Sequence, residues 1–275
     1  MKIFKPNRGK DFVKGSERVG EITTTYMSDD FTGNDGDAPD ATKWTIIKEI
    51  GGDFTSDVEI QNNKADFTIS GSTVYPPGLG TSDLISNFWS GNFSVQIDWE
   101  ILSLIGINNG SVNINLIVEN AYYTEPNYKR VMLARQISTR SGLDWYRADL
   151  YITDPFESNF DTYSTSELDG RMKISRVDGL LTVWYWNSVN QQWEWNGSTD
   201  GWVAGTINGD VQFRVQIIAF DFSAGVKELH ATVDNFIGPI ISQQSNRAMY
   251  VFDKEAQPKV FKSFDKKVRR PKIWR

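Results

Sequence analysis

One stretch, from Arg171 to Gly197, constrains the fold of this 275-residue chain more than any other. Its sequence is RMKISRVDGLLTVWYWNSVNQQWEWNG, in which Met172 and Ile174 alternate with polar residues as in a half-buried strand. Asp178-Gly179 is a strong hairpin signal, because glycine adopts the positive φ that tight turns between strands require. The stretch therefore predicts a strand, a tight turn, a second strand over Leu180 to Trp186 and a short third strand. The rest of the chain must cover this apolar hairpin.

Alternating apolar and polar residues recur at short spacing on both sides of the hairpin. Phe93, Ile97 and Ile101, for example, share one face of a predicted strand. No amphipathic helical pattern of ten residues or more is present, and many strands without intervening helices are typical of an antiparallel sandwich or barrel. The further predicted strands are residues 57–61, 64–70, 92–102, 111–119, 129–137, 145–152, 210–222 and 227–237.

Charge divides the chain into an acidic body and two basic ends. Residues 1–20 carry a net charge of +4 and residues 246–275 carry +7, whereas residues 21–245 carry −17. Such asymmetry is typical of terminal interaction segments, and the alternative is a pair of solvated tails. An acidic body repels nucleic acid, so we expect the ends to bind protein instead.

The two ends also resemble each other in sequence, since Lys2-Ile3-Phe4-Lys5 matches Lys259-Val260-Phe261-Lys262. We expect two arms that dock on other proteins or on copies of this chain. The predicted arm residues are basic or aromatic: Lys2, Phe4, Lys5, Lys259, Phe261, Lys262, Arg269, Arg270 and Trp274.

Three segments together resemble the concanavalin A-like lectin/glucanase superfamily. They are DDFTGNDGDAPDATKW from Asp29, the hairpin with its aromatic turn, and LHATVDNFIG from Leu229. The resemblance implies an all-β, antiparallel two-sheet jelly-roll sandwich over residues 28–239, flanked by basic arms at 1–27 and 240–275. It says little about function, because this scaffold serves lectins, glycosidases and virus structural proteins alike.

The glucanases of this superfamily carry Glu-x-Asp-x-Glu on a strand that faces the cleft. The corresponding residues here are Gln96, Asp98 and Glu100, which period 2 places on one face. Retaining hydrolysis needs two carboxylates, and an amide at position 96 cannot act as the nucleophile. We therefore expect no catalytic residue and no enzyme activity.

Two kinds of binding site follow from the resemblance and from the aromatic residues. Jelly-roll modules often hold a structural calcium, and we predict Asp30, Asp35, Asp37 and Asp234 as its ligands. The competing interpretation is turn chemistry, in which Asp side chains close local hydrogen bonds.

The second site is for glycan. Flat aromatic faces suit sugar rings, so we predict Trp184, Trp186 and Trp193 as glycan-binding residues, against the alternative that they fill the core. His230 has no second histidine to share a metal, and we expect it to be structural.

These observations favour a non-enzymatic virion structural protein of a bacteriophage, in a tail, a fibre or a capsid decoration, fixed into an assembly by its arms. The alternative is a carbohydrate-binding module for a cell-surface glycan, followed by a glycoside hydrolase. The chain has no cysteine, no signal-peptide pattern and no apolar run long enough to cross a membrane, so we expect synthesis in the host cytoplasm and no membrane insertion.

Overall fold

The computed structural model describes residues 28–51, 54–73, 78–121, 127–153 and 156–238, and the backbone of two further short strands. The chain divides into two compact units, residues 25–241 and the two ends together, 1–24 with 242–275. In the second unit the structure describes only β17 (Met249–Phe252) and β18 (Pro258–Phe261), which pair antiparallel.

Every regular element in the described part of the chain is a β-strand, and no helix long and apolar enough to cross a membrane occurs there. Nine strands form one sheet in the order β13-β12-β11-β6-β16-β4-β3, with β1 beside β16 and β14 beside β12. Its strands are β1 (Ser28–Asp29), β3 (Phe54–Gln61), β4 (Lys64–Thr73), β6 (Phe93–Ile105), β11 (Asp169–Val177), β12 (Leu180–Asn187), β13 (Gln192–Glu194), β14 (Trp202–Thr206) and β16 (Gly225–Ile237).

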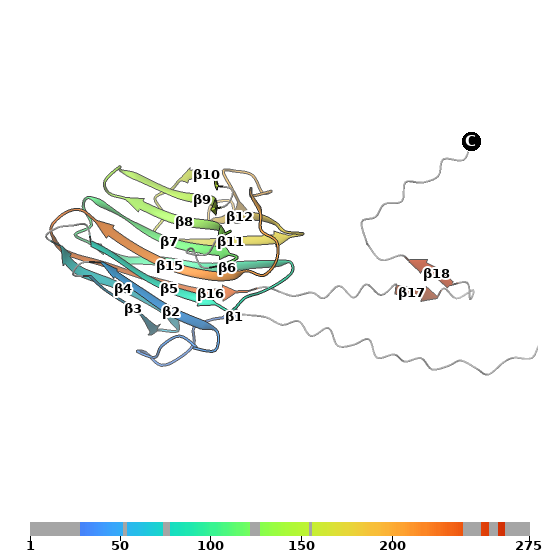
Figure 1. Cartoon of the computed structure of the whole chain (residues 1–275), viewed down its shortest axis with the longest axis horizontal. Coiled ribbons are helices and arrows are strands. Elements are labelled where there is room, and N and C mark those ends of the chain that lie inside the picture. Colours follow the sequence, from blue (N-terminus) through green and yellow to red (C-terminus); the bar gives the residue numbers. More distant parts are fainter. Residues whose placement is uncertain are drawn as a thin grey trace, which may run out of the picture. The chain divides into compact units, whose positions relative to one another are not determined.

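Seven strands form the second sheet in the order β10-β9-β8-β7-β15-β5-β2, and the two sheets lie face to face (Figure 1). All pairings are antiparallel. The strands are β2 (Trp44–Gly51), β5 (Gly78–Ser86), β7 (Gly110–Glu119), β8 (Lys129–Ser138), β9 (Leu143–Thr153), β10 (Phe156–Ser164) and β15 (Gln212–Asp221).

The core lies between the sheets and is built from alternate residues of each strand. Phe93 in β6 meets Phe213 in β15 with ring centroids 5.0 Å apart, and both side chains are buried. Phe236 in β16 is fully buried and packs edge-on against Trp44 in β2, at 4.8 Å. The Trp44 indole in turn donates a 2.7 Å hydrogen bond to Asp29, which fixes the acidic loop at the start of the body. These aromatic pairs join the two sheets.

The predicted hairpin is confirmed as β11 and β12, joined by Asp178 (φ 52°) and Gly179 (φ 85°). Both central residues have positive φ, the geometry that matches the twist of paired strands. The two-sheet antiparallel jelly roll is confirmed as well, but five of its strands, β1, β2, β5, β10 and β14, lie outside the predicted ranges. The predicted domain boundaries and arms fall largely outside the described residues and stay predictions.

Two of the unpredicted strands lack the alternation of apolar and polar residues for a physical reason. Strand β10 (FESNFDTYS) is an edge strand with mostly exposed residues, so it needs no alternation of apolar and polar residues. Strand β5 (GLGTSDLIS) contains Gly80, where a Cβ would clash with the side chain of Ile69 in the facing sheet. Close approach of the two sheets, rather than strand propensity, therefore selects glycine at this position.

The aromatic contacts between the sheets predict a large stability cost for Phe236→Ala. Truncating a fully buried phenylalanine removes its transfer free energy and leaves a cavity, which together cost about 3–5 kcal/mol. Phe156→Ala on β10 is the matched control, because that ring is 72% exposed, and it should cost less than about 1 kcal/mol. Chemical denaturation measures both. Equal losses would contradict the assignment of Phe236 to the core.

Candidate functional site

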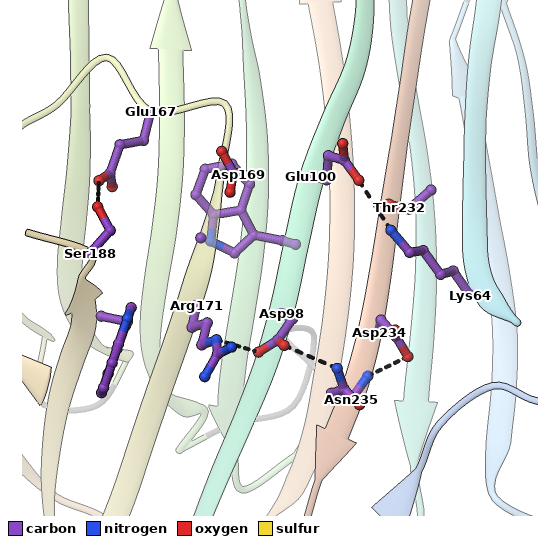
Figure 2. A pocket seen from close by; sticks show the side chains of 13 residues that line it. Lys64, Asp98, Glu100, Glu167, Asp169, Arg171, Ser188, Thr232, Asp234 and Asn235 are labelled. Carbon is purple, nitrogen blue, oxygen red and sulfur yellow. Dashed lines mark hydrogen bonds and ion pairs between the residues drawn. The ribbon is translucent and has the colours of Figure 1, made fainter. Parts of the chain in front are cut away.

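A cavity of about 580 Å³ opens on the outer face of the nine-stranded sheet, the face turned away from the core. We call it the cleft. Side chains from β4, β6, β11, β12 and β16 line it, so it crosses the middle of the sheet (Figure 2). The lining residues are Lys64, Asp98, Trp99, Glu100, Glu167, Asp169, Gly170, Arg171, Trp186, Ser188, Thr232, Asp234 and Asn235.

Strand β6 supplies the acids at the centre of the cleft. Its burial pattern alternates strictly from Phe93 to Ile101, with the odd-numbered residues in the core. Gln96, Asp98 and Glu100 therefore share the outer face, as their spacing predicts. Asp98 and Glu100 line the cleft, whereas Gln96 lies beyond its rim, beside Lys173 of β11.

Asp98 contacts one polar side chain from each neighbouring strand, an ion pair on one side and a hydrogen bond on the other (Figure 2). The Arg171 Nε atom on β11 lies 3.4 Å from its Oδ1, and the Asn235 amide on β16 donates a 3.0 Å hydrogen bond to its Oδ2. Asn235 reaches this position because β16 bulges between Asp234 and Ile237, with Asn235 itself in the left-handed region at φ 49°. Asparagine tolerates this conformation better than most residues. The bulge therefore aims the amide into the cleft.

Asp234 lies directly opposite Asp98 in the pairing of β16 with β6. Burial raises the pKa of Asp234 above its ordinary value, and the nearby charges of Asp98 and Asp30 act in the same direction. The Asp234 carboxyl is therefore easier to protonate than an ordinary aspartate.

Glu100 lies across from Asp169 on β11 and Thr232 on β16. The Lys64 ammonium on β4 is 3.1 Å from Glu100 Oε2, and both side chains are well exposed to solvent. Glu167, just before β11, accepts a 3.2 Å hydrogen bond from the Ser188 hydroxyl. The cleft thus holds five carboxylates against two cations, Lys64 and Arg171.

The three tryptophans predicted to bind glycan lie together on the same outer face, where Trp186 lines the cleft and the other two lie beside it. Trp186 on β12 packs edge-on against Trp193 on β13 at 5.4 Å, and Arg171 lies 5.5 Å from the Trp186 ring centroid. The Lys173 ammonium sits between Trp184 and Trp193, at 4.4 and 4.5 Å from their centroids. We call Trp184, Trp186 and Trp193 the tryptophan face. All three are partly exposed, so none is a core residue.

Burial lowers the pKa of Lys173 to about 8. The two indole rings shelter its ammonium from water, and no carboxylate forms an ion pair with it among the described residues. Cation–π contact compensates for part of the lost hydration.

A second hollow, of about 420 Å³, adjoins the cleft and shares Lys64 and Thr232 with it. His230 lines this hollow, with Nε2 at 2.7 and 2.9 Å from the two carboxylate oxygens of Asp66. The pair anchors His230 to β4, in keeping with the structural role expected for it. The two hollows together form one trough across the sheet.

The structure does not gather the predicted calcium ligands into one cluster. Asp35 accepts a hydrogen bond from the Asn62 backbone and Asp37 from Asn34, so these side chains close local turns. Asp30 accepts from Thr32, and Asp234 lines the cleft. Among the described residues, no group of three or more Asp, Glu or His side chains is placed to hold a metal ion. Calcium binding stays a prediction without geometric support.

The predicted arm residues lie outside the described side chains. Lys259 and Phe261 belong to β18, of which only the backbone is described, and the others have no described position.

The cleft also contains residues that sequence reasoning missed: Lys64, Glu167, Asp169, Arg171 and Asn235. No sequence motif marks these residues, because they come together only in the folded sheet. Strands β11 and β16 pair with β6, and β4 pairs with β16.

The pKa of Lys173 predicts a pH dependence of stability. Below about pH 8 the lysine is charged in both the folded and the unfolded chain. As the pH rises from about 8 towards the ordinary value of 10.5, the folded protein loses this proton first, so the unfolded chain binds more protons and stability increases. Denaturation of the wild type and of Lys173→Met at several pH values measures this. The wild type should gain stability relative to the variant over that range, and a difference independent of pH would contradict the burial of the charge.

Comparison with known proteins agrees with this architecture. No protein-family model matches the chain, and no curated protein sequence matches it. Among solved structures, the chain is similar to a β-1,3-1,4-glucanase (lichenase) from a mouse hindgut metagenome, with a TM-score of 0.50, 10% identity, and coverage of 78% of this chain and 99% of that one. It is also similar to the Bacillus licheniformis β-glucanase, with a TM-score of 0.50, 7% identity, and coverage of 78% and 98%. At these identities the similarity establishes the fold alone, an antiparallel two-sheet jelly roll.

These comparisons correct the functional prediction. Both structures are glycoside hydrolases and neither is a virion protein, so the prediction of a non-enzymatic virion structural protein is contradicted and its virion partners have no support. The error has a physical origin. The prediction weighed the one carboxylate missing from β6 at Gln96 and could not include the acids that β11 and β16 bring to the same cavity.

Proposed function

We propose that the chain is a glycoside hydrolase that binds a polysaccharide in the cleft and cleaves it there. The observation that carries the proposal is one cavity in which five carboxylates from three neighbouring parts of the sheet meet beside exposed tryptophan. Glycoside hydrolysis needs two carboxyl groups flanking the scissile bond, with oxocarbenium character in the transition state that nearby negative charge stabilises.

Two of these acids keep the positions of the glucanase motif. Glu100 corresponds to its last residue, which the resemblance makes the general acid/base, and Asp98 to its middle residue. The contacts of Asp98 with Arg171 and Asn235 hold it in place, so it is suited to support the reacting groups. The Lys64–Glu100 ion pair is open to solvent and therefore weak, so Glu100 can leave it to contact a bound sugar.

The tryptophan face would supply affinity. Sugar rings present apolar faces that stack on indole, and Trp186 lines the cleft itself. Because the adjoining hollow at His230 extends the cleft across the sheet, the trough fits a chain of several sugars better than a single one. The excess of carboxylates disfavours polyanionic polysaccharides. The lichenase and the β-glucanase act on β-glucans, so neutral β-glucans are the first substrates to test.

Release of reducing ends from a panel of neutral polysaccharides, led by mixed-linkage β-1,3-1,4-glucan, tests the proposal. The wild type should produce new reducing ends, and Glu100→Gln should lower kcat by at least about 100-fold, the usual contribution of a general acid. Glu157→Gln on β10 is the matched control, since it lies in the other sheet, and should retain full activity. Binding of a polysaccharide without any turnover would contradict the hydrolase.

Trp186→Ala should weaken binding of the hydrolysed polysaccharide about tenfold, roughly 1.4 kcal/mol, because one stacking surface is lost. Trp145→Ala provides the control. That indole is on β9 of the other sheet, bonded to Gln136, and its loss should leave affinity unchanged. Affinity electrophoresis or calorimetry with Glu100→Gln as background measures binding without turnover. Equal effects of the two substitutions would contradict binding at the tryptophan face.

A further inference from the structure

A hydrolase with glutamine at position 96 lacks one of the two carboxylates that its reaction requires. The missing group must lie within about 5–5.5 Å of the Glu100 carboxyl if the enzyme retains anomeric configuration. The cleft offers four other carboxylates, those of Asp98, Glu167, Asp169 and Asp234. Their positions and contacts separate them.

Asp169 is the acid that stands directly opposite Glu100. Strands β11 and β6 are antiparallel, and Asp169 is the partner of Glu100 in their register. Opposed residues on one face have Cβ atoms about 4.5–5.5 Å apart, so their side chains can bring the two carboxyl groups to the separation of about 5–5.5 Å that a retaining pair needs. Both side chains line the cleft, and Figure 2 shows them projecting into it from adjacent strands.

The backbone that carries Asp169 is fixed. Ile101 of β6 donates a 2.7 Å backbone hydrogen bond to the Leu168 carbonyl, just before Asp169. Gly170, just after it, pairs with Trp99 and lies so close to the core that a Cβ would come within 2.6 Å of the Tyr146 hydroxyl and 3.1 Å of the Trp99 ring. Anchors on both sides thus hold Asp169 across from Glu100.

The other acids are engaged elsewhere. Asp98 is bound by Arg171 and Asn235, and it lies two residues along the same strand from Glu100. Asp234 is opposite Asp98 rather than Glu100 and accepts the Asn235 backbone N–H at 2.6 Å. Glu167 accepts from Ser188. These bonds stabilise each carboxylate in its present position.

Asp169, by contrast, is exposed and forms no hydrogen bond or ion pair with any residue that the structure describes. It can therefore turn toward a bound sugar without breaking a contact with the protein.

We propose that Asp169 is the catalytic nucleophile, replacing across the strand pair the carboxylate that Gln96 lacks, with Glu100 as acid/base. The inference rests on the proposed hydrolase function. In the first step Asp169 attacks the anomeric carbon and forms a glycosyl ester, while Glu100 gives its proton to the departing glycosidic oxygen. In the second step Glu100 takes a proton from water, whose oxygen attacks the same carbon and releases the Asp169 carboxylate. The balance is one glycoside and one water giving two sugars.

Trapping the glycosyl ester tests the assignment. The probe is a 2-deoxy-2-fluoro glycoside of the oligosaccharide that the wild type cleaves, which slows the second step and leaves the sugar on the nucleophile. Peptide mass spectrometry should locate the label on Asp169. Asp169→Asn should lower kcat at least 1,000-fold, and Asp169→Gly with azide should recover turnover and yield a glycosyl azide of inverted configuration.

Asp200→Asn, an exposed turn residue outside the cleft, is the matched control and should retain activity, with unfolding midpoints confirming that each variant folds. A label on Asp98 or Asp234, or an Asp169→Asn variant with more than a tenth of wild-type turnover, would overturn the role of Asp169 while leaving the hydrolase intact. A wild type that neither turns over any polysaccharide nor becomes labelled would overturn the hydrolase and, with it, this inference.

Discussion

The pairing of β6 with β11 on one side and β16 on the other is the constraint on which the rest of the site depends. Because side chains alternate along β6, the same strand sends Ile97 and Trp99 into the core and Asp98 and Glu100 into the cleft. A shift of one residue in either pairing would bury these acids and expose the aromatic residues. Packing between the sheets therefore fixes the register, and the register places the carboxylates.

The cleft concentrates charge in a way that packing alone does not require. Five carboxylates face two cations, and the two on β6 differ in their support. Asp98 has an arginine and an amide, whereas Glu100 has one solvent-exposed lysine. A structural surface would neutralise or disperse such charge, since like charges opposite each other on neighbouring strands destabilise a sheet. Such a local loss of stability is typical of functional sites.

Much of the fold could be predicted from the sequence because the hairpin and the alternating strands carry strong local patterns. Asp178 and Gly179 both adopt the positive φ that the tight turn requires. The inward faces of β6 and β15 are buried as predicted. The edge strand β10 and the glycine-containing β5 lack alternation for physical reasons, exposure in one and close sheet contact in the other, so local patterns could not reveal them.

The site was less accessible to sequence reasoning. The spacing of Asp98 and Glu100 predicts their shared face, and the three tryptophans do lie together. Asp169 has no such signal, because it lies at the start of β11, two residues before the alternating pattern begins at Arg171. Only its pairing with Glu100 of β6 marks it as a candidate site residue. On β6 alone the glucanase motif is incomplete, whereas β11 and β16 bring further carboxylates to the same cleft.

The most direct test of the account is where an oligosaccharide binds. Indole N–H resonances of the ten tryptophans can be followed by NMR while a β-glucan oligosaccharide is added to the Glu100→Gln protein. If sugar binds at the tryptophan face, the signals of Trp184, Trp186 and Trp193 should shift together and saturably, while those of the buried Trp44 and of Trp145 in the other sheet stay in place. Shifts confined to indoles away from the cleft, or none at any concentration for every glycan that the protein binds, would contradict it.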